Sequence, residues 1–280
     1  MDLHTLSKQM VKVLNTTDTT QLEPYGSQIV ESTAIEIPSL PYQAPTVYSL
    51  LDSIQPLPAY STVFGTCEDG VPFLMDLRDP SPGAILIVGD PGSGKSRLLR
   101  TILTSTSLVN TPDKVNYCLI TSNDRNFYAV TGKDHCLAAA SPYDRAASDL
   151  IMEMSALAEQ RRNGRHRGPA VILAIDDLAV FAGERLDYDG FIHFKWLLEE
   201  GPKSHIWPVV TLNAHQFKKV DKRLLSAFGS LFFSSMQSPR LLEEFAGGYS
   251  PSARSLYPGY QFEFMYAGDW IRFTLPAVVE

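Results

Sequence analysis

The sequence predicts an α/β fold with a mostly parallel sheet and a C-terminal β-hairpin. Short apolar runs alternate with longer segments of helical periodicity between residues 84 and 234. Alternation of this kind is typical of parallel strands covered on both faces by helices. Near the end of the chain, residues 260–266 and 270–275 flank Ala267-Gly268-Asp269, which predicts a closing hairpin.

The chain divides by composition into an N-terminal extension, residues 1–59, and a main domain, residues 60–280. Apolar spacing over residues 3–14 predicts a short amphipathic helix, and the threonine-rich stretch after it is typical of a linker. Five prolines lie within residues 38–58. Because proline lacks a backbone donor and restricts the residue before it, we expect this segment to be extended.

In the main domain, each element is predicted from its own pattern. A hairpin opens the domain, because strand-like residues 60–65 and 71–77 flank Glu68-Asp69-Gly70. Helices place apolar residues on one face, whereas buried parallel strands are uninterrupted apolar runs. On these patterns we expect strands at 84–88, 115–121, 169–175, 206–212 and 231–234, and helices from residue 95 onward and over 143–162 and 189–200.

Composition argues against several classes of protein. A formal net charge of −7 gives no overall attraction to nucleic acid, which counts weakly against a monomeric DNA-binding protein. No apolar stretch approaches the ~18 residues of a membrane span, and the N-terminus lacks a signal-peptide pattern. Three scattered cysteines and six histidines show neither disulfide nor zinc-ligand spacing. We therefore expect a cytoplasmic protein that does not insert directly into a membrane.

The strongest motif lies between the first buried strand and its helix. Residues 89–96 read G-x-x-x-x-G-K-S, the phosphate-binding P-loop pattern, in the strand–loop–helix context that it requires. The alternative is a glycine-rich turn that matches by chance. Glycines let backbone N–H groups wrap a phosphate, the lysine would reach the β- and γ-phosphates, and the serine would ligate Mg²⁺. The residues expected to bind the nucleotide are Gly89, Asp90, Pro91, Gly92, Ser93, Gly94, Lys95, Ser96 and Arg97.

Two carboxylates and an amide follow later strands of the predicted sheet. Asp176 and Asp177 come directly after residues 169–175, where a P-loop protein carries the aspartate that holds Mg²⁺. We expect Asp176 at the metal with Ser96, and Asp177 as the candidate that polarises the attacking water. The alternative is that the pair caps the following helix. Gln216, after the next strand, is a candidate sensor of the γ-phosphate or of water, or an ordinary surface amide.

The nucleotide is expected to be ATP, bound with Mg²⁺. The sequence holds no Asn-Lys-x-Asp motif for reading guanine, and the protein-kinase pattern is missing. A small-molecule kinase would need an arginine-rich lid, whereas residues 181–189 hold only Arg185. ATP hydrolysis is therefore the predicted chemistry.

The order of these motifs resembles the motor domain of the FtsK/SpoIIIE–HerA superfamily, from about residue 60 to residue 276. Residues 70–77 are similar to its G-x-P-x-x-x-D-L lead-in, and residues 151–162 to its E-M-x-x-R helix. Asp176-Asp177 stands at its Asp-Glu position and Ala214-His215-Gln216 at its Ala-Thr-Gln, while residues 256–260 are similar to its L-x-P-G turn. An Asp-Asp pair here also resembles the ATPase modules of type VII secretion motors.

The resemblance implies a RecA-like P-loop NTPase core, assembly into a homo-oligomeric, hexameric ring, and ATP-driven movement of a polymer through its pore. The polymer is double-stranded DNA in most relatives and protein in the secretion branch. Two positions depart from the family. Asp177 is one methylene shorter than glutamate, and Lys203 lies where a Gly-Arg usually supplies an arginine in trans. Lysine lacks the planar fork of arginine, so we expect slower hydrolysis.

Three functional hypotheses remain open from the sequence. The first is a ring ATPase that translocates double-stranded DNA. The second is an ATP-dependent assembly switch with weak or no hydrolysis, and the third is a protein-secretion motor subunit with a protein partner. Basic stretches at residues 161–167 and 218–223 bear on the choice, because they either contact DNA phosphates or are solvated helix ends.

Overall fold

The computed structural model describes residues 44–183, 186–246, 254–266 and 269–277. These residues fall within one compact unit, Ala44–Glu280. The helix predicted over residues 3–14 and the linker after it lie outside the described residues. No helix in the described ranges has the length and apolar character needed to cross a membrane.

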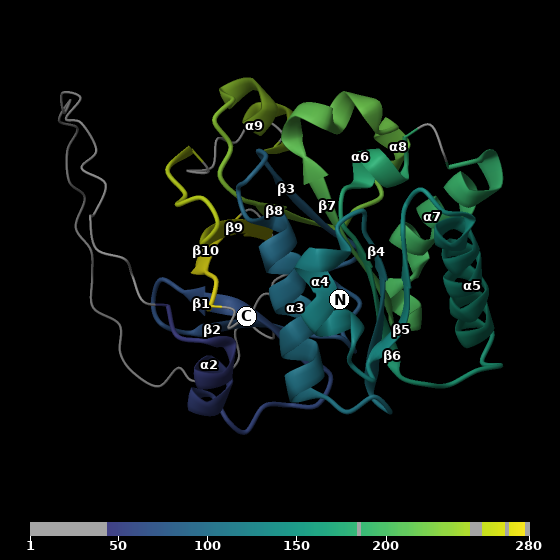
Figure 1. Ribbon diagram of the computed structural model, residues 1–280, viewed down its shortest axis with the longest axis horizontal. Coiled ribbons are helices and arrows are strands. Elements are labelled where there is room, and N and C mark those ends of the chain that lie inside the picture. Colours follow the sequence, from purple (N-terminus) through teal and green to yellow (C-terminus); the bar gives the residue numbers. More distant parts are fainter. Residues whose placement is uncertain (1–43, 184–185, 247–253, 267–268, 278–280) are drawn as a thin grey trace. The chain divides into compact units, whose positions relative to one another are not determined.

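In this part of the chain, ten strands form one sheet in the order β2-β1-β10-β9-β8-β3-β7-β6-β4-β5 (Figure 1). Six of them, from β8 to β5, run parallel, while β9, β10, β1 and β2 pair antiparallel. The predicted α/β class, with a mostly parallel sheet and a C-terminal hairpin, is confirmed. The strands are β1 Ser61–Cys67, β2 Pro72–Asp76, β3 Ile85–Gly89, β4 Val115–Ile120, β5 Cys136–Ala140, β6 Ala170–Ile175, β7 Ile206–Asn213, β8 Ser230–Phe233, β9 Gln261–Tyr266 and β10 Asp269–Thr274.

Helices cover both faces of the parallel strands (Figure 1). The α-helices are α2 Val47–Ser53, α3 Lys95–Val109, α4 Asp124–Thr131, α5 Arg145–Arg162, α6 Leu178–Phe181, α7 Tyr188–Glu200, α8 Lys222–Leu225 and α9 Pro239–Ala246; η1 Pro202–Ser204 and η2 Ala214–Lys219 are 3₁₀ helices.

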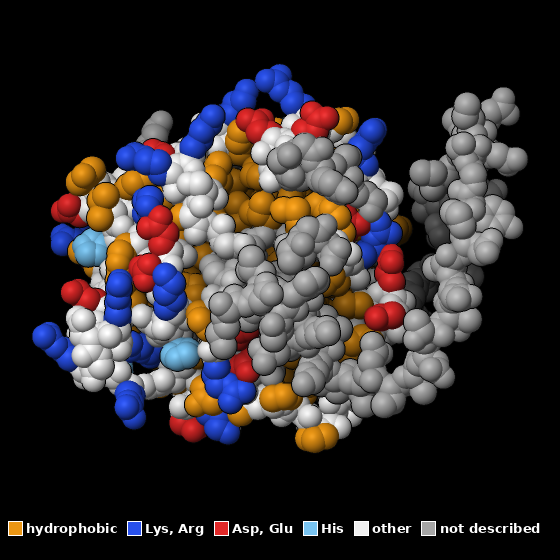
Figure 2. Space-filling view, turned by 180° about the vertical axis from the view of Figure 1, so that it is seen from behind, with side chains coloured by type: hydrophobic (Ala, Val, Ile, Leu, Met, Phe, Trp, Pro, Cys, Tyr) orange, Lys and Arg blue, Asp and Glu red, His pale blue; other side chains and the backbone are white. Residues whose placement is uncertain are grey.

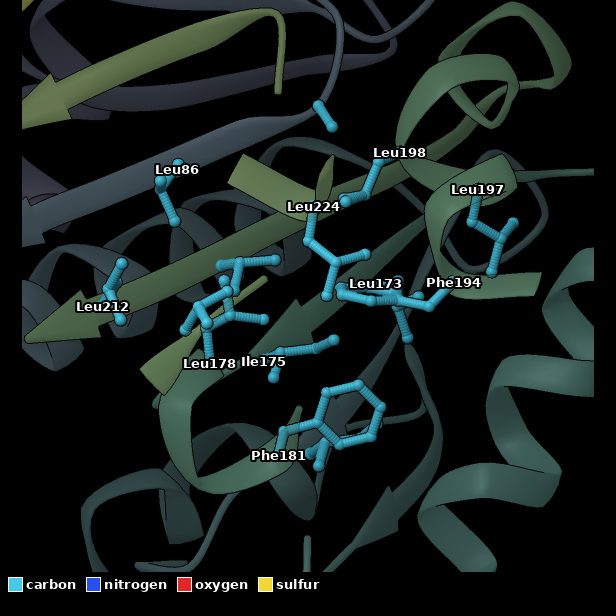
Figure 3. Close-up of a cluster of buried hydrophobic side chains, with 14 of the residues drawn as sticks. Leu86, Leu173, Ile175, Leu178, Phe181, Phe194, Leu197, Leu198, Leu212 and Leu224 are labelled. Atoms are coloured by element: carbon cyan, nitrogen blue, oxygen red, sulfur yellow. The ribbon is translucent and has the colours of Figure 1, made fainter. Parts of the chain in front are cut away.

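Alternate residues of β3 enter two separate cores. Ile85 and Ile87 pack on the face that α3 and α4 cover, whereas Leu86 and Val88 pack on the face that α5, α6 and α7 cover. Figure 3 shows the second core, where Ile175 of β6 lies near Phe181 of α6. Because both faces are buried, the central strands are mostly apolar, and since they are parallel, β3 and β6 end on the same side of the sheet.

The antiparallel strands are joined to the parallel part by aromatic side chains. Phe232 of β8 stacks on Phe264 of β9 with ring centroids 4.5 Å apart, and on Phe64 of β1 at 5.2 Å. Phe73 of β2 and Phe273 of β10 complete the cluster, at 4.9 Å from one another. Aromatic pairs at these separations are favourable beyond the area that they bury. The closing hairpin is thus part of the core.

Several elements differ from the sequence expectation, among them α2, α4 and β5. The proline-rich segment was expected to be extended, but α2 forms within it, where Thr46 Oγ1 accepts the Ser49 N–H at 3.1 Å as an N-cap and Leu50 and Leu51 are buried. Helix α4 and the edge strand β5 were not predicted, because both are short and β5 exposes alternate residues.

The first and last described segments pair with each other. The Ala277 N–H donates to the Pro45 carbonyl at 2.8 Å, and the Val47 N–H donates to the Ala277 carbonyl at 3.1 Å. The chain therefore enters and leaves the described domain at one place, beside α2.

Candidate nucleotide-binding site

The P-loop joins the end of β3 to the start of α3, as its motif requires. Gly92 and Gly94 have φ of 76° and 97°, a region that glycine adopts at little cost. A Cβ on Gly94 would lie 2.6 Å from the Cα of Gly259, so this position also needs glycine for close packing. A Cβ on Gly92 would meet nothing within 4 Å, and the loop is open there.

Two other segments hold the loop in place. Ser93 Oγ lies 2.6 Å from Ser234 Oγ, and the Asp90 N–H donates to the Ser235 carbonyl at 3.1 Å. From the other segment, the Gly259 N–H donates to the Ser93 carbonyl at 3.0 Å. These contacts fix the backbone of a loop that has no regular structure of its own.

Lys95 is buried at the base of the loop, with only 7% of its surface exposed. Its Nζ donates to the carbonyls of Gly89, at 3.1 Å, and Asp90, at 2.8 Å. Burial lowers the pKa of Lys95 to about 8, against the opposing effect of Asp176, Asp177 and Asp90. The Lys95 ammonium thus lies beside the loop, where little solvent can stabilise its charge.

Asp176 lies at the loop because β6 and β7 are parallel and in register. Ile175 of β6 pairs with Val210 of β7, which places Asp176 beside Thr211. Asp176 Oδ1 accepts the hydroxyl of Ser96 at 2.8 Å and that of Thr211 at 2.9 Å. Burial raises the pKa of the Asp176 carboxyl, and the two hydroxyl hydrogen bonds act in the opposite direction.

Asp177 has an uncommon backbone conformation for a residue with a side chain, with φ 76°. Its Oδ1 accepts the N–H groups of Ala179, at 3.1 Å, and Val180, at 3.3 Å, and so caps α6. Its own N–H donates to Thr211 Oγ1 at 2.8 Å. The capping contact that the sequence left as an alternative is present in the structure.

Asn213, at the end of β7, connects Asp177 to Gln216. Its Nδ2 donates to Asp177 Oδ2 at 3.2 Å and to Gln216 Oε1 at 3.3 Å. The structure therefore places the two residues that were expected to contact the attacking water in one hydrogen-bonded group.

The site fits a nucleoside triphosphate with Mg²⁺. The buried ammonium of Lys95 and the open backbone at Gly92 provide charge and N–H donors for phosphates. The oxygens of Ser96 and Asp176, 2.8 Å apart, are hard ligands of the kind Mg²⁺ prefers. These residues could hold the ion where it would meet the β- and γ-phosphates.

Lys203 lies far from the P-loop of its own chain. Lys203 lies in η1, before the start of β7, whereas the P-loop follows the end of the parallel strand β3, so the two are at opposite ends of the strands. The eight residues of β7, at about 3.3 Å each, separate these ends by roughly 26 Å. Lys203 Nζ donates instead to Glu200 Oε1 at 2.8 Å.

Sequence reasoning missed Thr211 and Asn213 as parts of the site. Both are polar residues at the end of a strand that is otherwise apolar and buried. In a strand buried on both faces, a hydroxyl or an amide needs a partner, and this was the signal available in the sequence.

Comparison with known proteins extends these observations. Residues 60–187 match the FtsK/SpoIIIE family. Over 96 residues the chain is 30% identical to the ESX-5 secretion system protein EccC5 of Mycobacterium marinum (strain ATCC BAA-535 / M), which covers 34% of this chain and 7% of EccC5.

Two solved structures share the fold. Thermomonospora curvata EccC (ATPases 2 and 3), in complex with a signal sequence peptide, superposes with a TM-score of 0.63 at 19% identity, covering 89% of this chain and 46% of that one. The monomer form of the pCW3 conjugation coupling protein TcpA, with ATPγS, gives 0.64 at 15% identity, covering 85% and 70%. The chain thus spans less than half the length of EccC5 and of the EccC structure. Residues 60–187 are thus similar to the FtsK/SpoIIIE family, and the chain shares its fold with the EccC and TcpA structures.

Proposed function

We propose that this chain binds ATP with Mg²⁺ and hydrolyses it as one subunit of a ring-shaped motor. The observation that carries the proposal is the buried ammonium of Lys95 next to the Ser96–Asp176 pair at an open glycine loop. A triphosphate requires a positive charge that is shielded from water, and its metal requires oxygen ligands.

Each residue has a role that follows from its place. Lys95 would exchange its carbonyl partners for the β- and γ-phosphate oxygens, and the loop N–H groups would hold the remaining phosphates. Ser96 and Asp176 would hold Mg²⁺, which neutralises charge that develops on the phosphates. Thr211 positions the Asp176 carboxylate through its hydroxyl.

Asp177 and Gln216 are proposed to orient the attacking water. The free lone pairs of Asp177 Oδ2 and Gln216 Oε1 lie next to the shared Asn213 amide, where a water could donate to either oxygen. The capping bond from Oδ1 holds the Asp177 carboxylate in this orientation, so capping and catalysis are compatible.

The ring proposal rests on the position of Lys203. It cannot reach the P-loop of its own chain, but a neighbouring subunit in a ring can present it to that site. An arginine supplied in trans is worth 10³–10⁵ in rate in related chemistry. We propose that Lys203 takes this part with a smaller effect, because an ammonium contacts fewer phosphate oxygens.

For the polymer, double-stranded DNA remains the first prediction, and a polypeptide is the second candidate. EccC5 is a secretion system protein, and the EccC structure contains a signal sequence peptide, which favours the second. Arg161 donates to the carbonyls of Ser204, His205 and Pro169, so it is engaged within the fold. Basic and acidic side chains are interspersed on the face shown in Figure 2.

The first prediction tests the nucleotide site. Lys95→Ala removes the charge that faces the phosphates, so we expect ATP binding by isothermal titration calorimetry to be lost while the fold is kept by circular dichroism. Asp176→Asn removes a metal ligand, so hydrolysis should fall by at least about 100-fold while nucleotide binding largely survives. Wild-type ATP affinity in Lys95→Ala would contradict the assignment.

The second prediction separates the two parts played by Asp177. Asparagine caps a helix as well as aspartate does, so Asp177→Asn should leave stability within about 0.5 kcal/mol, whereas Asp177→Ala should lose about 1 kcal/mol. Both variants lack the carboxylate, and both should lower turnover by about 10²–10⁴. If Asp177→Asn hydrolyses ATP at the wild-type rate, Asp177 is a helix cap alone.

The third prediction concerns pH. Free Lys95 has a pKa of about 8, and bound phosphates would raise it, so binding takes up a proton once the pH exceeds that value. ATP affinity should be constant near pH 7 and fall above pH 8 by at most about tenfold per unit. Calorimetry in buffers of different ionisation enthalpy measures the proton uptake. Affinity that is unchanged up to pH 9.5 would rule out this coupling.

The fourth prediction tests the ring. Lys95→Ala and Lys203→Ala are each expected to be inactive or slow alone, and a mixture should regain activity because some interfaces pair an intact P-loop with an intact Lys203. Specific activity should also rise with protein concentration. No recovery on mixing, with activity independent of concentration, would favour a nucleotide switch.

Stimulation of the wild-type ATPase rate by double-stranded DNA would favour DNA as the polymer, whereas the absence of stimulation would favour a polypeptide.

A further inference from the structure

A tight turn ahead of β9 lies against the P-loop. In residues 257–260, the Tyr260 N–H donates to the Tyr257 carbonyl at 3.2 Å, and Gly259 has φ 82°. Proline followed by a glycine of positive φ is the signature of a type II turn. This turn is the one whose Gly259 N–H reaches Ser93 and whose backbone packs on Gly94.

The turn presents aromatic surface next to the start of α3. The guanidinium of Arg97, the residue directly after Ser96, lies 4.4 Å from the centre of the Tyr260 ring. The Tyr257 ring lies 5.5 Å from that of Tyr260. Tyr257 is 52% exposed and Tyr260 37%, so neither ring is needed to fill the core. We call Arg97, Tyr257 and Tyr260 the aromatic platform.

The platform lies on the side of the P-loop where the nucleoside of a bound nucleotide would be. In the sheet, β7 and β6, whose ends carry Thr211 and Asp176, lie on one side of β3. Strands β8 and β9 lie on the other side, and the turn directly precedes β9. The metal ligands attract the γ-phosphate end of the triphosphate to the first side. The phosphate chain therefore runs across the loop, and the sugar and base leave it toward the second side.

We propose that the aromatic platform binds the nucleobase by stacking. This inference rests on the proposed ATP binding and adds the part of the site that holds the base. Bases stack on tyrosine rings and on arginine guanidinium planes, and the Arg97 guanidinium lies over the Tyr260 ring, so an outer face of this stacked pair would take the base. The Tyr257 ring lies beside the pair, tilted by 56° to the Tyr260 ring, and the hydrogen bond from the Tyr257 N–H to Gln261 Oε1, at 3.0 Å, fixes the turn.

The test compares Mg·ATP with Mg·tripolyphosphate, which has the phosphate chain but no base. For the wild type we expect ATP to bind more tightly than tripolyphosphate by about 5- to 150-fold, the usual range for stacking of one base. Tyr260→Ala should weaken ATP by a similar factor and leave tripolyphosphate unchanged. Tyr260→Phe keeps the ring and should retain ATP affinity. Tyr128→Ala, an 82% exposed tyrosine on α4, is the matched control and should change neither.

The outcomes separate the platform from the phosphate site. If Tyr260→Ala weakens both compounds equally, the turn only supports the P-loop and the platform proposal is wrong. If Tyr260→Ala binds ATP as the wild type does, it is also wrong, while the ATP site stands. Lys95→Ala should lose both compounds. Failure of the wild type to bind either one would overturn the proposed function together with the platform.

Discussion

An ammonium group buried under a glycine loop constrains the whole of this site. A charge removed from water is costly unless nearby groups compensate for it. Two carbonyls of the loop do so for Lys95, and they can reach it only because the backbone curls back at Gly92 and Gly94. A backbone bent in this way has few hydrogen bonds of its own. It therefore needs support from outside, which the segments around Ser234 and Gly259 provide.

On one side of β3, the polar residues at the ends of β7 and β6 are hydrogen-bonded to one another. On the side of β7 and β6, one hydroxyl, that of Thr211, donates to Asp176 and accepts the N–H of Asp177. The Asp176 carboxylate is thus linked to the backbone of Asp177 through a single hydroxyl. From there Asn213 continues the connection to Gln216 and η2. A continuous chain of hydrogen bonds therefore connects Asp176 to η2, after the end of β7.

The parts predicted well from the sequence are those in which local pattern and fold agree. The buried strands and the P-loop carry patterns that tertiary contacts do not override. The α2 segment was misread because its prolines lie outside the helix itself, at Pro45 and Pro56, while Thr46 caps its start. Strand β5 lacks an apolar run because it lies at an edge of the sheet. The positive φ of Asp177 and the contacts of Asn213 arise from strand pairing across long stretches of sequence, which no local pattern reports.

The pairing of Ala277 with Pro45 and Val47 has a consequence for how this domain can be built into longer chains. A domain whose entry and exit are adjacent needs no long connection across its surface when copies follow one another in a polypeptide. Domains whose ends lie close together commonly tolerate insertion and circular permutation. Modular reuse is thus compatible with the way the backbone closes on itself beside α2.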